Sequence, residues 1–106
     1  MVAFHNNVTV PTTGAAVPLS SGTVAAIRVL NPAAHDIWIQ ATTANIAPTS
    51  RAGALRLMPG ETLAADLALS NLFPGLGAGP YYLWGMADAH LAHAGIAGVT
   101  VSVSHA

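Results

Sequence analysis

Charge is the scarcest feature of this sequence of 106 residues. Only 7% of the residues are charged, against about 25% in typical soluble domains. Lysine is absent, the three basic residues are arginines, and the formal net charge is −1. With no basic cluster to neutralise phosphates, we do not expect binding to nucleic acid. A free monomer with so little charge associates readily, so a surface that is largely covered by partners is favoured over the alternative, a small neutral protein kept soluble by Ser, Thr, Asn and Gln.

Cysteine and long apolar runs are also missing. The absence of cysteine excludes a disulfide framework and thiolate chemistry. No apolar run approaches about 18 residues, so no membrane span is expected. The opening residues MVAFHNNVTV lack the basic and apolar segments of a signal peptide, which predicts synthesis in the cytoplasm. An apolar content of 53% argues against disorder, and the length predicts one domain over residues 1–106.

Short alternating segments make up most of the chain. In the last one, Val99, Val101 and Val103 alternate with small hydroxyl residues, which predicts a strand with its valines in a core. The expected strands are residues 6–10, 23–31, 36–41, 54–58, 62–70, 80–87 and 98–104. Segment 62–70 also suits a helix, but a strand is favoured because a Pro-Gly-Glu turn leads into it from another strand.

Breakers and loops separate these strands. Residues 42–53 read as a loop, residues 59–61 as a tight turn, and residues 88–95 as a turn or one short helical turn. Seven to eight short strands without an amphipathic helix predict an all-β fold. We expect a single antiparallel β-sandwich or jelly roll.

His90 and His93 form an H-x-x-H pair, which would share one face of a helical turn and could contribute to a zinc site. The nearest other candidate ligands are His5, His35, Asp88 and His105. None of them forms a second pair at metal spacing, so exposed loop histidines are the favoured interpretation. We expect no metal and no other cofactor.

Catalytic patterns are equally weak. No G-x-S-x-G nucleophile motif occurs. A carboxylate pair would have to combine Glu61 with Asp36, Asp66 or Asp88, and solvated acids are the simpler interpretation. The glycines of residues 75–79 match no phosphate-binding loop. We therefore expect that the protein is not an enzyme.

Aromatic residues are concentrated in the expected strand 80–87. Tyr82 and Trp84 share one face of this strand, and Tyr81 lies on the other. A strand with large residues on both faces is normally covered on both. We expect Trp84 to lie inside, and Tyr81 or Tyr82, together with Trp38, to contact another subunit. The alternative is that these aromatic residues form a platform on which a sugar stacks.

Five segments carry a resemblance to a known group of proteins: VTVPTTGAAVPL, IRVLNPAAHDIWIQA, LRLMPGETLAADL, YYLWGMAD and GVTVSVSHA. In this order, they resemble the small β-sandwich virion proteins of tailed phages and phage-like gene transfer agents. The resemblance spans nearly the whole chain. Proteins of this group decorate capsids, form the base of a head spike or fibre, or belong to tail parts, and the group supplies no catalytic residues.

The resemblance implies a virion structural protein, acting as a capsid-surface decoration or a head spike or fibre base subunit. Its expected partners are further copies of itself, in a homo-oligomer, and other virion proteins such as the major capsid or spike/fibre protein. Its expected location is the surface of a virion or phage-like particle. Two other functions stay open: a carbohydrate-binding module on a host-recognition fibre and a jelly-roll enzyme.

Overall fold

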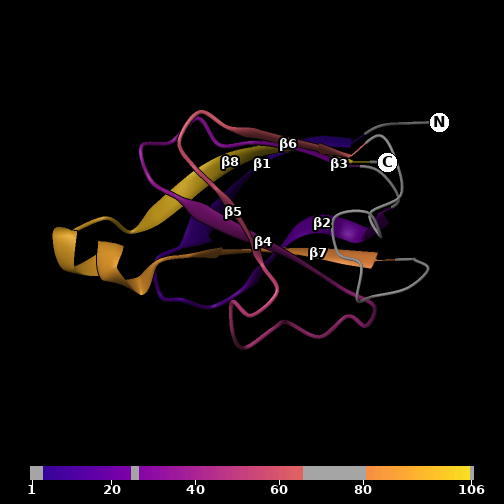
Figure 1. The fold of residues 1–106 in the computed structure, drawn as a ribbon, viewed down its shortest axis with the longest axis horizontal. Coiled ribbons are helices and arrows are strands. Elements are labelled where there is room, and N and C mark those ends of the chain that lie inside the picture. The colour runs from indigo at the N-terminus through magenta and orange to yellow at the C-terminus, as the bar shows by residue number, and fades with distance from the viewer. Residues whose placement is uncertain (1–3, 25–26, 66–80, 106) are drawn as a thin grey trace.

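The computed structural model describes residues 4–24, 27–65 and 81–105, which form two antiparallel sheets of four strands each (Figure 1). The strands are β1 (Phe4–Pro11), β2 (Val17–Val24), β3 (Ile27–Leu30), β4 (Ile37–Thr42), β5 (Leu55–Leu57), β6 (Thr62–Ala65), β7 (Tyr81–Ala87) and β8 (Gly98–His105). A short 3-10 helix, η3 (Ala89–Ala94), lies between β7 and β8.

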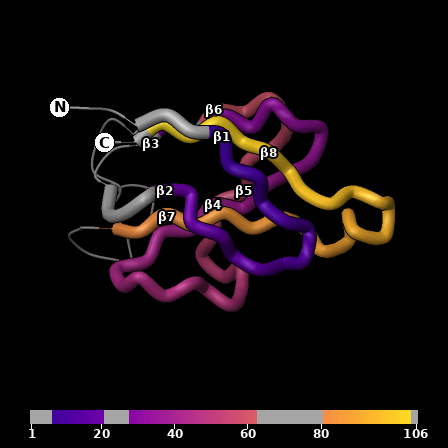
Figure 2. The backbone as a smooth tube through the Cα atoms, turned by 180° about the vertical axis from the view of Figure 1, so that it is seen from behind, coloured from indigo at the N-terminus to yellow at the C-terminus, as the bar shows by residue number. Residues whose placement is uncertain are grey.

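The strand order identifies the architecture. Sheet one has the order β1-β8-β3-β6, and sheet two has the order β2-β7-β4-β5. Figure 2 shows the two sheets as separate layers, with the chain crossing between them. Eight antiparallel strands in this interleaved order form a jelly roll, so the predicted all-β sandwich is confirmed.

The core lies between the two sheets and is built from alternating residues. In β4, Ile37 and Ile39 are fully buried, while Trp38 between them points to the outer face and is half-buried. In β8, the three valines predicted to face the core are all buried. This alternation puts one face of each strand into the core and leaves the other face to solvent or to a covering loop. No helix in the described parts of the chain is long and apolar enough to cross a membrane.

Gly85 in β7 lets the two sheets approach each other closely. A Cβ at this position would lie 2.9 Å from Leu19 Cδ2 in the same sheet and 3.1 Å from Val10 Cγ2 in the opposite sheet. Both distances are shorter than ordinary carbon contacts, so only glycine fits without displacing a neighbour. The residue is therefore required by packing rather than by a turn.

The prediction of one strand over residues 23–31 is wrong. Thr23 and Val24 belong to β2 and pair with β7 in sheet two, whereas Ile27 begins β3 and pairs with β8 in sheet one. The apolar run contains no proline, glycine or asparagine to mark this change of sheet, so the pattern reads as continuous. Because the predicted strand began at residue 23, the prediction also missed the first part of β2, which begins at Val17.

The other expected elements are found with shifted ends. The expected strand 62–70 appears as β6 over its first four residues, and its remainder lies outside the described residues. The segment predicted as a turn or short helical turn contains η3. Gly95 ends this helix at φ 81°, and its N–H bonds to the carbonyl of Ala92. Glycine is the usual residue at such a left-handed cap.

Candidate interaction surfaces

The aromatic residues expected at an interface lie on different sides of sheet two. Tyr81 is only 3% exposed and belongs to the core between the sheets. Tyr82 follows it on the outer face and is half-buried, as is Trp38 in β4. An interface role therefore stays a prediction for Tyr82 and Trp38, because the buried ring of Tyr81 has little surface to offer a partner.

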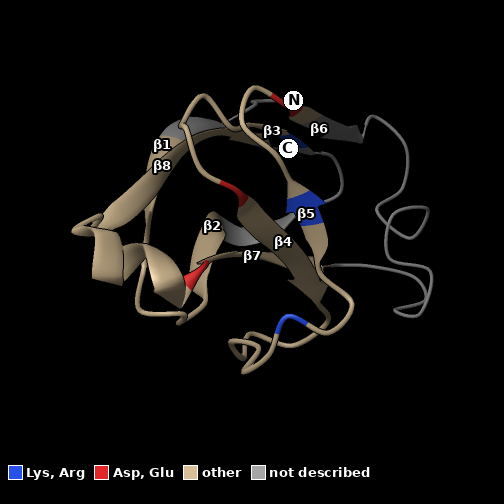
Figure 3. Ribbon diagram, turned by 60° about the vertical axis from the view of Figure 1, so that its left-hand side comes forward, with Lys and Arg blue, Asp and Glu red and all other residues tan. Residues whose placement is uncertain are grey.

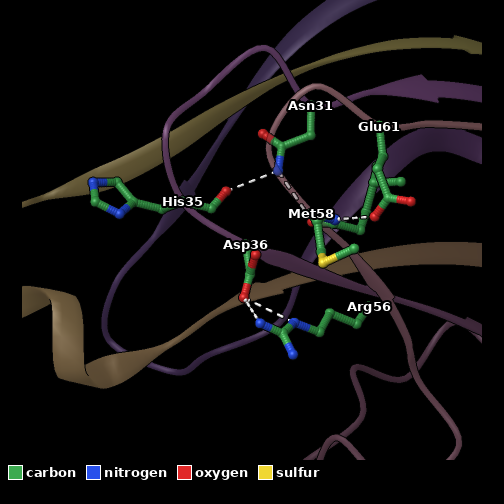
Figure 4. A network of polar contacts seen from close by, with 7 residues as sticks. Asn31, His35, Asp36, Arg56, Met58 and Glu61 are labelled. Atoms are coloured by element: carbon green, nitrogen blue, oxygen red, sulfur yellow. Dashed lines mark hydrogen bonds and ion pairs between the residues drawn. The ribbon is translucent and has the colours of Figure 1, made fainter.

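Trp38 is the centre of a small charged cluster on this outer face. The guanidinium carbon of Arg51 lies 4.2 Å from the ring centroid of Trp38, and that of Arg56 lies 5.9 Å away. Arg56 also donates two hydrogen bonds to one carboxylate oxygen of Asp36 (Figure 4), and this ion pair is partly exposed. Figure 3 shows how few charged positions mark the described ribbon as a whole. Cation–π contacts of this kind are worth about 0.5–1 kcal/mol at exposed sites. The contact of Arg51 joins the loop of residues 43–54 to sheet two, whereas Arg56 belongs to β5 of the sheet itself.

Trp84 is buried, as predicted, but it does not lie between the sheets. It shares the outer face with Tyr82, and its indole N–H donates to the Thr42 hydroxyl at 2.7 Å. The loop of residues 43–54 lies on the side of sheet two away from sheet one (Figure 1). Gln40, opposite Trp84 in the sheet, donates to the Ala52 carbonyl in that loop. The chain thus supplies the cover that we expected from a neighbouring subunit.

This arrangement bears on the sugar platform. A stacked sugar needs an open aromatic face, and the described aromatic residues of sheet two do not offer a shared one. Trp84 is 6% exposed, and the Arg51 guanidinium lies over the ring of Trp38. The geometry favours loop packing as the role of these side chains.

Asn31 forms a buried polar network that the sequence pattern did not reveal (Figure 4). It is 0% exposed, and its side-chain amide donates to the carbonyls of His35 at 2.8 Å and Leu57 at 3.1 Å. Its side-chain oxygen accepts from the N–H of Ala33. Its backbone N–H donates to the Glu61 carbonyl. Asn31 therefore joins the end of β3 to the segments that precede β4 and β6, and its role is structural.

The acidic residues each have a structural partner in the described chain. Glu61 accepts a hydrogen bond from the N–H of Met58 across the Pro-Gly-Glu turn. Asp88 accepts from the N–H of His90 and so caps η3, and Asp36 pairs with Arg56. Asp66, the fourth acid considered for catalysis, lies outside the described residues. These contacts explain the three described acids without catalysis.

The two histidines of the H-x-x-H pair lie on η3, and both are exposed. The rings of His90 and His93 meet edge to face, with their centroids 6.0 Å apart. Within residues 4–24, 27–65 and 81–105, no group of three or more potential ligands is close enough to hold a metal ion. The absence of a metal stays a prediction.

The outer face of sheet one is different in character from that of sheet two. Small polar side chains alternate outward from β1 and β8 and bond across the strands. The hydroxyls of Thr9 and Thr100 are 2.9 Å apart, and the Ser102 hydroxyl donates to the side-chain oxygen of Asn7 at 3.0 Å. The one charged side chain on this face, among the residues described, is Arg28 of β3. This surface, which includes Asn7, Thr9, Thr100 and Ser102 and is called the hydroxyl face, is therefore nearly uncharged.

Comparisons of this chain with protein-family models, with curated proteins and with solved structures found no match.

Proposed function

We propose that this protein is a structural subunit of a virion or phage-like particle and acts through protein–protein contacts. Its place would be a decoration on the capsid surface or the base of a head spike or fibre. The segments that resemble virion β-sandwich proteins support this proposal. Jelly rolls of eight strands also occur in viral capsid domains, although a fold by itself does not fix a function.

The observation that carries the proposal is the hydroxyl face of sheet one. Thr9 and Thr100 are exposed there, and Arg28 is the one charge described on this face. A monomeric surface normally mixes charges of both signs, which keep molecules apart in solution. Interface cores are depleted of charge instead. The face thus resembles a surface that is covered in the working state.

The test places a charge on this face without touching the core. Thr100→Lys puts an ammonium group at the centre of the hydroxyl face, and Thr49→Lys adds the same group to the exposed loop of residues 43–54. Both proteins should fold, as judged by thermal melting. We expect the unchanged protein and Thr49→Lys to sediment with particles isolated from cells that carry the gene, and Thr100→Lys to bind them at least tenfold more weakly.

Two results would contradict the proposal. One is that the unchanged protein does not associate with particles and is absent from them by mass spectrometry. The other is that Thr100→Lys binds as well as Thr49→Lys, which would remove the hydroxyl face from the argument.

A further inference from the structure

The edges of the two sheets are not equally protected. Edge strands expose unpaired backbone groups, and proteins usually protect them with short length, charge, proline or an irregularity. In sheet two, β5 has three residues with Arg56 at its centre, and β2 contains Pro18 and a register shift. In sheet one, β6 is described over only four residues, whereas β1 has eight residues without a charged side chain.

The pairing of β1 shows which of its backbone groups face outward. The N–H of Thr12 donates to the carbonyl of Ala97 and so continues the ladder between β1 and β8. In an antiparallel pair, every second residue exchanges hydrogen bonds with its partner strand. The even-numbered residues of β1 therefore bond to β8. The backbone N–H and C=O groups of His5, Asn7 and Thr9 point outward from the edge of the sheet, away from β8.

We propose that this edge of β1, which is free of any partner strand among the described residues, pairs with β1 of a second copy of the chain, antiparallel and centred on Asn7. This register places Asn7 opposite Asn7 of the other copy, and His5 opposite Thr9. All three pairs join outward N–H groups to outward carbonyls, so each pair can exchange two hydrogen bonds. The two copies of sheet one then form one continuous sheet, and their hydroxyl faces become a single surface.

The absence of charge on β1 favours a second copy of the chain over a charged segment of another protein. The β1 strand carries no charge that would select an oppositely charged strand. Arg28, on β3, is separated from the free edge of β1 by β8. In the paired sheet, the two copies of Arg28 would be five strand spacings apart, about 24 Å at 4.8 Å per strand. This exceeds the screening length of about 8 Å at physiological salt, so like charges do not oppose the pairing.

Proline sets the end of the proposed contact. Pro11 occupies the next outward position of β1, and it has no N–H to donate. The pairing is therefore confined to the residues before it. This inference deepens the proposed function, since it names the contact through which copies of a particle subunit would join.

A disulfide provides a direct test because the natural chain has no cysteine. In a hydrogen-bonded antiparallel pair, the two Cα atoms are about 5.5 Å apart, which lies within the range that a disulfide spans. Asn7→Cys should therefore give a crosslinked dimer under mild oxidation. Asn45→Cys, at an exposed asparagine in the loop of residues 43–54, is the matched control and should give at least tenfold less dimer.

A second variant tests the contact without a crosslink. Thr9→Lys places a charge beside the free edge, and sedimentation equilibrium should show a dissociation constant at least tenfold higher than for Thr49→Lys. Oligomers that persist with equal crosslinking of Asn7→Cys and Asn45→Cys would overturn the β1 contact and leave the proposed particle function intact. A protein that stays monomeric at every concentration also overturns it, while failure to bind particles counts separately against the proposed function.

Discussion

Removing the side chain of Asn31 should destabilise the domain strongly although no apolar core residue is lost. In Asn31→Ala, the buried carbonyl of Leu57 loses its donor, at a cost of about 1–3 kcal/mol. The partly buried carbonyl of His35 and N–H of Ala33 also lose a partner, but water can replace part of each bond. We expect the free energy of unfolding to fall by about 2–5 kcal/mol.

Urea unfolding at neutral pH measures this loss. The midpoint should fall while the slope of free energy against urea stays unchanged, because the surface exposed on unfolding is nearly the same. Asn45→Ala is the control, since Asn45 is exposed in the loop of residues 43–54. It should change stability by no more than about 0.5 kcal/mol. A loss of less than about 1 kcal/mol for Asn31→Ala would refute the assignment of Asn31 as a structural joint.

Asn31→Asp tests the direction of the hydrogen bonds at the same position. An ionised carboxylate would face the carbonyls of His35 and Leu57, to which the amide now donates. Both burial and these carbonyls disfavour the charge, so the pKa of the new carboxyl should be raised in the folded state. The variant should be most stable below the unfolded pKa of about 4 and should lose stability as pH rises through the raised folded value. A pH-independent difference from the natural protein would contradict this reasoning.

Four further substitutions separate turn strain, core packing and surface contact. Gly60→Ala should lower the stability measured by thermal melting by about 1–2 kcal/mol. Gly60 has φ +80° with open space around it, so the loss comes from the left-handed backbone conformation alone. Gly85→Ala should cost about 1–3 kcal/mol by overpacking against Leu19, and an unchanged melting temperature would show that the sheets can separate freely. Tyr81→Ala should destabilise the fold by about 3–5 kcal/mol, as expected for a core aromatic residue. Tyr82→Ala should retain most of that stability and weaken assembly, and normal particle incorporation of Tyr82→Ala would remove it from the predicted interface.

The alternation of valine and hydroxyl residues predicted both faces of β8 correctly, because side-chain period and burial agree in a strand with one buried face. It could not predict the break between β2 and β3. There the chain changes sheets within an apolar run, and the sequence pattern continues through the change without a break. The order of strands in the two sheets was likewise beyond reach, since it depends on contacts between distant segments.

At the candidate surfaces, too, the sequence pattern predicted burial but not the contacts between distant segments. Trp84 was correctly expected to be buried, but periodicity could not show that a loop covers it on the outer face. The Gln40–Ala52 bond and the stacking of Arg51 on Trp38 depend on how residues 43–54 fold back, and a loop has no period to reveal that. Asn31 could be flagged only as a residue before proline. The partners of its side chain are as far as 26 positions away in sequence, at Leu57.

The pairing of β1 with β8 also decides how the domain responds to mechanical load. Phe4 lies opposite His105, so the first and last strands meet at the same end of sheet one (Figures 1 and 2). A pulling force applied between these two residues acts along the hydrogen bonds, which lie perpendicular to antiparallel strands. The ladder would then open like a zipper, one pair after another, instead of shearing all its bonds together. A force that does not pull Phe4 and His105 apart would leave the hydrogen bonds between β1 and β8 unloaded. A subunit with this fold therefore withstands load best when the force is not applied between its first and last strands.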